Sequence, residues 1–317
     1  MSKNEIIDIF SWPVQSVLAQ LLQDKTTKQN IILAADTYFV GGEAVAPEEY
    51  ITEGLLRGMG DNPIQPRHVK SRTAQQDRTK KKAEVFTPVW ICNRMNNFCD
   101  EEWFGVKNVF NVEIDNGRSW QPRMRWVAFP EDRKWQDYVD STRIEITCGE
   151  APFLVSRYDA ADGSAIEISR RIGMLDRKLR VVSENVNNEE EWLYWTYRAF
   201  QSVYGYEYHG DNLLIARVNL LMTFFEYLES CLKRKPTDAE LRRVANIICW
   251  NIWQMDGLTG TVPLRTRPAA VRQETLFSTR EAAAREGIPC LIYDWRANRS
   301  IRFDSMRSKK KEKRSMK

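Results

Sequence analysis

The chain has 317 residues, of which 43% are hydrophobic and 28% are charged, and its formal net charge is +4. These values are typical of a globular protein, and no apolar stretch reaches the ~20 residues that a membrane-spanning helix needs. Two histidines, and six cysteines without a C-x-x-C pair, argue against a histidine-based metal site, a zinc knuckle and a disulfide framework.

The cysteines are scattered in apolar surroundings, which predicts buried, reduced thiols. The first residues lack the apolar core of a signal peptide. We therefore expect a cytoplasmic protein. Eleven tryptophans indicate large packed or interfacial surfaces.

Residues 1–82 are expected to form a mainly helical N-terminal region. A stripe at helical spacing is formed by Val14, Val17, Leu18, Leu21 and Leu22. Pro47 and Glu48 open a second candidate helix that continues through Leu56.

A basic stretch ends this region. Its cations are Arg67, Lys70, Arg72, Arg78, Lys80, Lys81 and Lys82, against the single acid Asp77. The stretch is either a solvated linker or a set of phosphate contacts on DNA. A second basic run, residues 304–317, is expected to be a disordered tail.

Residues 83–303 are expected to form the main domain. Thr87 and Pro88 are typical of the N-cap and first turn of a helix, here continuing to about Cys99. Short strand-like runs follow at 109–112 and 126–129. Residues 144–147 predict the first core strand.

The second half of this domain alternates helical and strand-like patterns. Residues 160–190 are polar and rich in arginine, so we expect an insertion there, followed by helices over 192–200 and 213–232. Thr237 and Glu240 form a capping-box pattern for a further helix, which leads into a strand-like run at 247–252. Residues 258–280 are expected to be loop, and 278–281 to open a short helix that Gly287 closes.

The stretch from Ile144 to Val155 is the most informative in the chain. An apolar run that carries Glu145 leads into the small-residue turn Thr147-Cys148-Gly149, and this turn leads into a helix-like segment. Such a turn can hold a nucleotide-like ligand at the carboxyl end of a parallel strand. The alternative is an ordinary corner between a strand and a helix.

Three other segments accompany this stretch in a characteristic order. Upstream is Phe86-Thr87-Pro88, and downstream are Tyr204-Gly205-Tyr206-Glu207-Tyr208 and the run from Asn251 to Leu258, which contains Asp256-Gly257. Together, over roughly residues 67–295, they resemble the S-adenosylmethionine-binding half of adenine-specific DNA methylases of bacterial restriction–modification systems.

The resemblance implies specific cofactor contacts. The expected site consists of Phe86, Thr87, Pro88, Glu145, Thr147, Cys148, Gly149, Phe153, Glu207, Tyr208, Asp256 and Gly257. In this family, Glu207 falls where the ribose hydroxyls are held, and Asp256 falls where the amine of the cofactor adenine is contacted. The ordinary alternatives are a solvated strand-end glutamate for Glu207, a turn cap for Asp256 and a hydrophobic staple for Phe86.

The sequence also departs from the family. Glu145, Ile146 and Ala151 replace the usual aspartate, proline and glycine of the loop, and no Pro-Pro pair occurs anywhere in the chain. The catalytic Asn/Asp-Pro-Pro-Tyr/Phe element is therefore missing, and we assign no catalytic residue here.

These departures predict half of a split enzyme. The expected fold is α/β, a Rossmann-like methyltransferase sheet that lacks the catalytic strand, with a helical N-terminal domain. A partner subunit would supply the catalytic motif and target recognition, and double-stranded DNA would be the substrate. The alternative is a non-catalytic subunit for cofactor sensing, DNA tethering or scaffolding.

Overall fold

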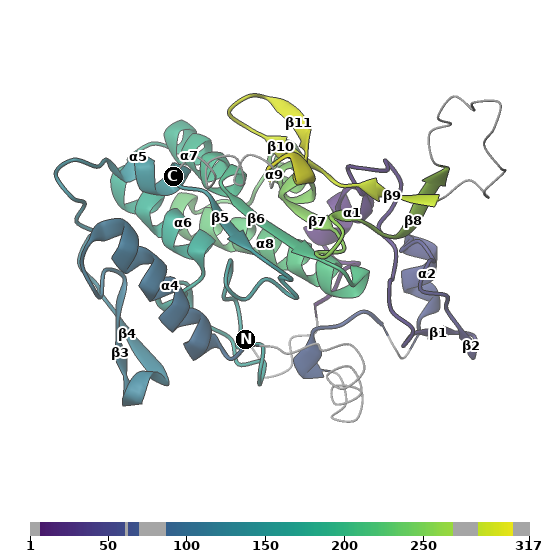
Figure 1. Cartoon of the computed structure of the whole chain (residues 1–317). Coiled ribbons are helices and arrows are strands. Elements are labelled where there is room, and N and C mark those ends of the chain that lie inside the picture. Colours follow the sequence, from purple (N-terminus) through teal and green to yellow (C-terminus); the bar gives the residue numbers. More distant parts are fainter. Residues whose placement is uncertain (1–6, 61–62, 70–86, 269–284, 307–317) are drawn as a thin grey trace, which may run out of the picture.

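The computed structural model describes residues 7–60, 63–69, 87–268 and 285–306 (Figure 1). Phe86, the basic residues from Lys70 to Lys82, and the tail from 307 onwards lie outside the described residues.

A three-stranded parallel sheet lies at the centre of the molecule (Figure 1). Its strands are β5 (Arg143–Glu145), β6 (Val203–Glu207) and β7 (Ile252–Gln254), in the order β5-β6-β7. Arg143 is opposite Val203, and Gly205 is opposite both Glu145 and Ile252. The expectation of a mixed α/β fold is thus confirmed.

Helices connect the three strands, because parallel neighbours require crossover connections. Helices α6 (Met174–Asn185) and α7 (Glu189–Gln201) join β5 to β6, and helices α8 (Gly210–Leu232) and α9 (Asp238–Asn251) join β6 to β7. Helix α8 is buried over most of its surface, as its nearly continuous apolar sequence predicts. Helices α7, α8 and α9 pack directly against the sheet.

The N-terminal segment packs onto this body. Its elements are α1 (Val14–Leu22), β1 (Phe39–Val40), β2 (Glu43–Ala44), α2 (Glu53–Gly58) and the 3-10 turn η1 (Arg67–Val69). The predicted apolar stripe of α1 is buried against α8 and α9 and belongs to the same hydrophobic core as the sheet.

A second group of elements precedes β5. It comprises α4 (Val89–Phe104), β3 (Asn111–Ile114), η2 (Asp115–Gly117), β4 (Ser119–Pro122) and α5 (Trp135–Asp140). Strands β3 and β4 form an antiparallel hairpin beside α4 (Figure 1). The 3-10 turn η3 (Ile168–Arg170) follows β5 and lies next to β4.

Two antiparallel hairpins end the described chain. They are formed by β8 (Thr261–Pro268) with β9 (Arg285–Pro289), and by β10 (Leu291–Asp294) with β11 (Arg299–Arg302). Cys290 and Ile292 pack with Tyr206, Trp253 and Met255 in a second, smaller core.

The capping box at Thr237 and Glu240 is confirmed, but the strand expected at 247–252 is wrong. Helix α9 continues to Asn251, because Leu241, Val244 and Ile248 keep a helical spacing toward the core.

The expectation that residues 160–190 form an arginine-rich insertion is also wrong. All of α6 lies within residues 160–190, and both Arg177 and Lys178 are buried. Arg177 forms a salt bridge with Asp100, and the Lys178 ammonium donates to the carbonyl of Val139 and to the Ser202 hydroxyl, so the buried donors find acceptors.

Several other boundaries differ from expectation. Helix α2 begins after the N-cap Thr52, because its hydroxyl accepts the Leu55 N–H, and Pro88 rather than Thr87 caps α4. Residues 126–129 form no strand, and the Val127 N–H donates to the Glu184 side chain of α6 instead of to a neighbouring strand. Strand β8 lies inside the expected loop, and Gly287 lies in β9 rather than at a helix end.

Candidate functional site at the carboxyl edge of the sheet

Three acids lie at or just beyond the carboxyl ends of the three parallel strands. Glu145 ends β5, Glu207 ends β6, and Asp256 lies two residues beyond β7. Because the strands are parallel, these positions meet at one edge, which is where open α/β sheets bind ligands. We call this region the carboxyl edge.

The loop after β5 has an alternating backbone conformation. Thr147, Gly149 and Ala151 have φ values of 46°, 53° and 64°. Between them, the Cys148 N–H donates to the Tyr206 carbonyl at 2.8 Å. Cys148 packs against Gly205, where an added Cβ would lie 3.3 Å from the thiol sulfur. The loop is therefore tied to the central strand.

Glu207 joins this loop to β6. Its buried carboxylate accepts the Gly149 N–H at 2.8 Å on one oxygen, and the N–H groups of Tyr208 and His209 at 2.9 and 3.0 Å on the other. The solvated glutamate considered above is thus wrong. Glu207 fixes the first turn after β5 relative to the end of β6.

Glu145 supports the far end of the same loop. Its buried carboxylate accepts the N–H groups of Phe153 and Leu154 at 3.4 and 3.2 Å. Burial raises the pKa of this carboxyl well above its usual value; the two N–H groups oppose that shift, and the charge of Glu207 adds to it.

The helix that follows Thr87 and Pro88 contacts this loop. Phe153 packs against a small apolar cluster that includes Val89 and Cys92 of the first turn of α4, and the Asn96 amide donates to the Phe153 carbonyl at 3.0 Å. Helix α4, which follows Thr87 and Pro88, and the loop after β5 are therefore neighbours, although they are far apart in sequence.

Asp256 and Gly257 form the third part of the edge. One Asp256 oxygen accepts the Leu258 N–H at 2.8 Å, so the turn-cap alternative is realised in part. Gly257 approaches the Tyr206 ring closely, since an added Cβ would lie 2.9 Å from a ring carbon. Burial, followed by the charge of Asp256, raises the pKa of the neighbouring Tyr208.

No protein-family model matches the chain, and neither the curated proteins nor the solved structures include a match.

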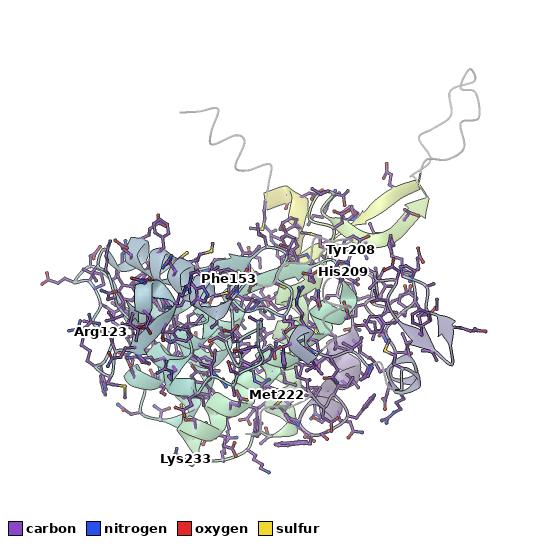
Figure 2. The ribbon with its side chains drawn as sticks, turned by 90° about the horizontal axis from the view of Figure 1, so that it is seen from below. Arg123, Phe153, Tyr208, His209, Met222 and Lys233 are labelled. Carbon is purple, nitrogen blue, oxygen red and sulfur yellow. The ribbon has the colours of Figure 1, made fainter. Side chains whose placement is uncertain are left out.

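Nine predicted cofactor residues lie at or beside the carboxyl edge. They are Glu145, Thr147, Cys148, Gly149, Phe153, Glu207, Tyr208, Asp256 and Gly257. Thr87 and Pro88 lie at the start of α4, next to the loop, whereas Phe86 lies outside the described residues. Figure 2 shows His209 beside Tyr208 and well apart from Lys233, the residue at the other end of α8, so only the His209 end of this helix belongs to the edge.

Gln254 is a part of the edge that sequence reasoning missed. Its amide accepts the Ile32 N–H at 3.0 Å and donates to the Ile32 carbonyl at 2.8 Å, and the Gly210 N–H donates to the Leu33 carbonyl at 2.9 Å. The N-terminal segment thus crosses the ends of β6 and β7. The only signal was a polar residue inside the apolar run Trp253–Met255.

Of the predicted DNA contacts, only Arg67 lies within the described residues. Its backbone N–H donates to the Glu150 carboxylate at 2.6 Å, and the Tyr158 hydroxyl donates to the other oxygen of Glu150 at 2.7 Å. The turn that leads into the basic stretch is therefore attached to the loop after β5.

The cysteines have free thiols, and Cys92, Cys148, Cys249 and Cys290 are buried. Cys231 is exposed, which corrects the expectation that all six are buried. Within the described part of the chain, no cluster of three or more metal-binding side chains occurs, and no helix is long and apolar enough to cross a membrane.

Proposed function

We propose that this chain is the cofactor-binding subunit of a split DNA adenine-N6 methyltransferase, acting in restriction–modification or phage defence. The sheet would be an incomplete Rossmann-like methyltransferase sheet, with S-adenosylmethionine at the carboxyl edge. The observation that carries the proposal is the bond between Glu207 and the Gly149 N–H, which joins the acid after the second strand to the left-handed loop after the first.

The carboxylates of Glu207 and Asp256 have few acceptor positions left for hydrogen bonds from a cofactor. Glu207 already accepts three backbone N–H groups, and a carboxylate offers about four acceptor positions. One ribose hydroxyl can therefore donate to Glu207 without displacing a backbone bond. Asp256 keeps one oxygen without a hydrogen bond from the described residues, and this oxygen would accept the adenine amine.

The catalytic element would come from a partner. Strand β5 is an edge strand among the described residues, and Ile144 and Ile146 are 46% and 64% exposed. Unpaired apolar edges favour association with another strand. The partner's Asn-Pro-Pro-Tyr strand would pair with β5 and hold the target adenine, which would be flipped out of the duplex. This chain alone would then transfer no methyl group.

The basic residues Arg67 to Lys82 would contact DNA phosphates beside this site. Such contacts position a protein without reading sequence, so target recognition would belong to the partner. The attachment of Arg67 to Glu150 supports this placement, because it brings the start of the basic stretch to the cofactor loop.

A second candidate is a non-catalytic scaffold, cofactor-sensing or DNA-tethering subunit. The hydrogen bonds of Glu145 and Glu207 favour it, because both carboxylates act as caps for the loop whether or not a ligand binds. Cofactor binding by the purified chain separates a scaffold from the other roles.

The sharpest variant is Asp256→Asn. Asparagine can still accept the Leu258 N–H, so the turn is kept, but the negative acceptor for the adenine amine is lost. We expect calorimetry to show S-adenosylmethionine binding to the unaltered chain and about tenfold weaker binding to the variant.

Asp294→Asn is the matched control, because Asp294 accepts the N–H groups of Arg296 and Ala297 in a similar turn of the β10–β11 hairpin. It should leave cofactor affinity unchanged. Equal affinities in all three proteins would reject the assignment of Asp256, and no binding by the unaltered chain would favour the scaffold.

A further inference from the structure

A cavity of about 260 Å³ lies between the end of the β3–β4 hairpin, η3 and helices α6 and α8. Its lining includes Met124, Ile168, Tyr227 and Cys231, with Arg123 and Arg180 among the cationic side chains. It is large enough for one bulky side chain, and its walls combine apolar surface with a few polar groups, as ligand pockets do.

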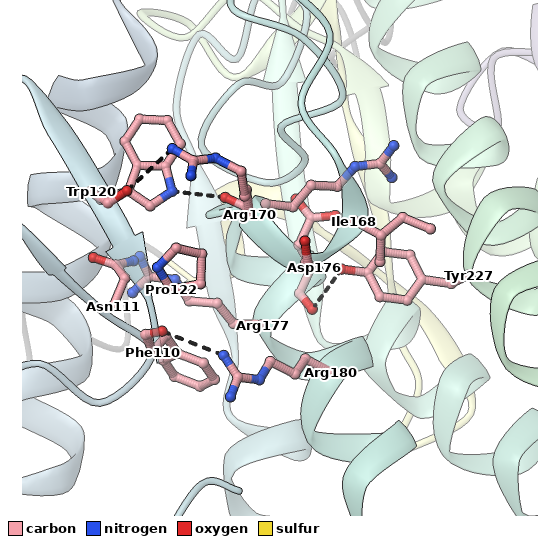
Figure 3. A pocket seen from close by; sticks show the side chains of 12 residues that line it. Phe110, Asn111, Trp120, Pro122, Ile168, Arg170, Asp176, Arg177, Arg180 and Tyr227 are labelled. Atoms are coloured by element: carbon pink, nitrogen blue, oxygen red, sulfur yellow. Dashed lines mark hydrogen bonds between the residues drawn. The ribbon is translucent and has the colours of Figure 1, made fainter. Parts of the chain in front are cut away.

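A smaller recess of about 20 Å³ adjoins this cavity and shares Ile168, Ser169, Arg180 and Tyr227 with it (Figure 3). Two of the charged side chains that line the recess each have one polar atom without a hydrogen bond. Arg171 Nη1 and Asp176 Oδ1 are buried and have no hydrogen-bond partner among the described residues.

Both side chains are held firmly by their other atoms. Arg171 is paired with Glu226, and the second oxygen of Asp176 accepts the Ser156 N–H at 2.8 Å. Their exposed fractions are 6% for the Arg171 side chain and 1% for Asp176. A buried donor and a buried acceptor at one recess are satisfied together by a hydroxyl, which accepts from Arg171 and donates to Asp176.

The segment 123–126, of which Arg123 and Met124 line the cavity, forms an apolar and positively charged rim. Met124 is 83% exposed and Trp126 is 72% exposed, and they alternate with Arg123 and Arg125. Tryptophan, methionine and arginine are the residue types that protein interfaces favour.

This rim is fixed in place by α6. Arg180 donates to the carbonyls of Arg123 and Arg125 at 2.6 and 2.9 Å, and the Val127 N–H donates to Glu184 at 2.8 Å. A surface that is ordered before binding loses less conformational entropy when a partner docks.

We propose that this surface docks a segment of a partner protein that inserts one tyrosine, with acidic residues beside it. The ring would fill the cavity, the phenol hydroxyl would reach the recess, and the acidic residues would pair with Arg123 and Arg125. This site requires neither cofactor nor DNA, so it stands apart from the carboxyl edge. Nucleic acid fits less well, because the buried Asp176 carboxylate disfavours a phosphate.

Fluorescence anisotropy with labelled synthetic peptides tests the proposal. The probes are three short acidic peptides that differ only in a central tyrosine, phenylalanine or alanine, together with a single-stranded oligothymidylate. We expect saturable binding of the tyrosine peptide, about tenfold weaker binding of the phenylalanine peptide because two polar atoms stay unsatisfied, and no measurable binding of the alanine peptide.

Protein variants locate the site. Cys231→Phe should abolish peptide binding by filling the cavity, and Arg125→Glu should weaken it by charge repulsion. Tyr194→Ala, which removes an exposed aromatic side chain of α7, is the control and should have no effect.

Equal affinities for the tyrosine and phenylalanine peptides would show that the recess holds only water. Binding of the oligonucleotide alone, sensitive to Trp126→Ala, would reassign the surface to nucleic acid, and either result overturns the proposal.

Discussion

At the scale of single residues, Ala151 shows how the loop tolerates a departure from the family pattern. Its φ of 64° lies in the left-handed region, where an L-residue other than glycine is strained by about 1–2 kcal/mol. Glycine would remove this strain but would lose about 0.5–1 kcal/mol through the greater entropy of the unfolded chain, and about 0.8 kcal/mol with the Ala151 methyl group, which is fully buried in the core.

We therefore expect Ala151→Gly to change the free energy of unfolding by less than about 0.5 kcal/mol, as measured by urea denaturation, because the relief of strain offsets both losses. The control is Ala199→Gly at an equally buried position of helix α7, where no strain is relieved, and it should lower the free energy of unfolding by about 2 kcal/mol. Equal losses in the two variants would mean that Ala151 is not strained.

Glu145 makes stability depend on pH. Burial raises the pKa of its carboxyl above the ordinary value of 4.5, so the folded chain binds this proton more tightly than the unfolded chain does. The contribution of Glu145 to stability is therefore greatest at low pH and declines as pH rises above about 4.5.

Glu145→Gln removes this titration. Its free energy of unfolding should fall less than that of the unaltered chain between about pH 5 and about pH 8, in urea titrations repeated at each pH. Glu190→Gln, at an exposed position of α7, should follow the unaltered chain. Parallel pH profiles for all three proteins would contradict a raised pKa at Glu145.

The sequence predicted where Glu145 and Ala151 lie, because Glu145 ends a strand and Ala151 belongs to the turn that follows it. It could not predict the contact of Gln254 with Ile32, which are 222 positions apart, or that of Arg67 with Glu150, which are 83 apart. Such contacts depend on how the elements pack, and local residue patterns carry no information about this.

At the scale of elements, the sequence located helices with a clear apolar stripe and failed where charge concealed one. Leu175, Leu179 and Val182 face the core at helical spacing in α6, yet the arginines and lysine between them suggested a solvated insertion. Buried salt bridges and carbonyl contacts reverse that expectation, and only the folded structure reveals the partners.

Arg217 of α8 fastens the N-terminal segment to the sheet. Its buried guanidinium donates to the carbonyls of Leu21, Gln23 and Ile252. A lysine cannot span three acceptors in this geometry. Arg217→Lys should lower the free energy of unfolding by about 2 kcal/mol in urea, with an unchanged m-value.

The control for this variant is Arg242→Lys, at an exposed position on α9. It should alter stability by less than about 0.5 kcal/mol. A similar small effect of Arg217→Lys would show that the N-terminal segment does not depend on this contact.

At the scale of the whole molecule, the chain combines a short parallel sheet, an open β5 edge and a carboxyl edge partly covered by its own N-terminal segment. The coarse α/β class follows from the alternation of helical and strand-like runs. The pairing of β3 with β4, of β8 with β9 and of β10 with β11 was not predicted, although the strand-like run at 109–112 overlaps β3. Strands of about four to eight residues carry little periodic signal, and nothing in the local sequence indicates which strand pairs with which.

The central claim is that S-adenosylmethionine binds at the carboxyl edge, and amide hydrogen exchange with and without the cofactor tests it most directly. Bound cofactor should slow exchange in residues 146–155, 207–210 and 255–257 and leave exchange in the β3–β4 hairpin unchanged. Protection confined to other segments, or no protection at saturating cofactor, would contradict it.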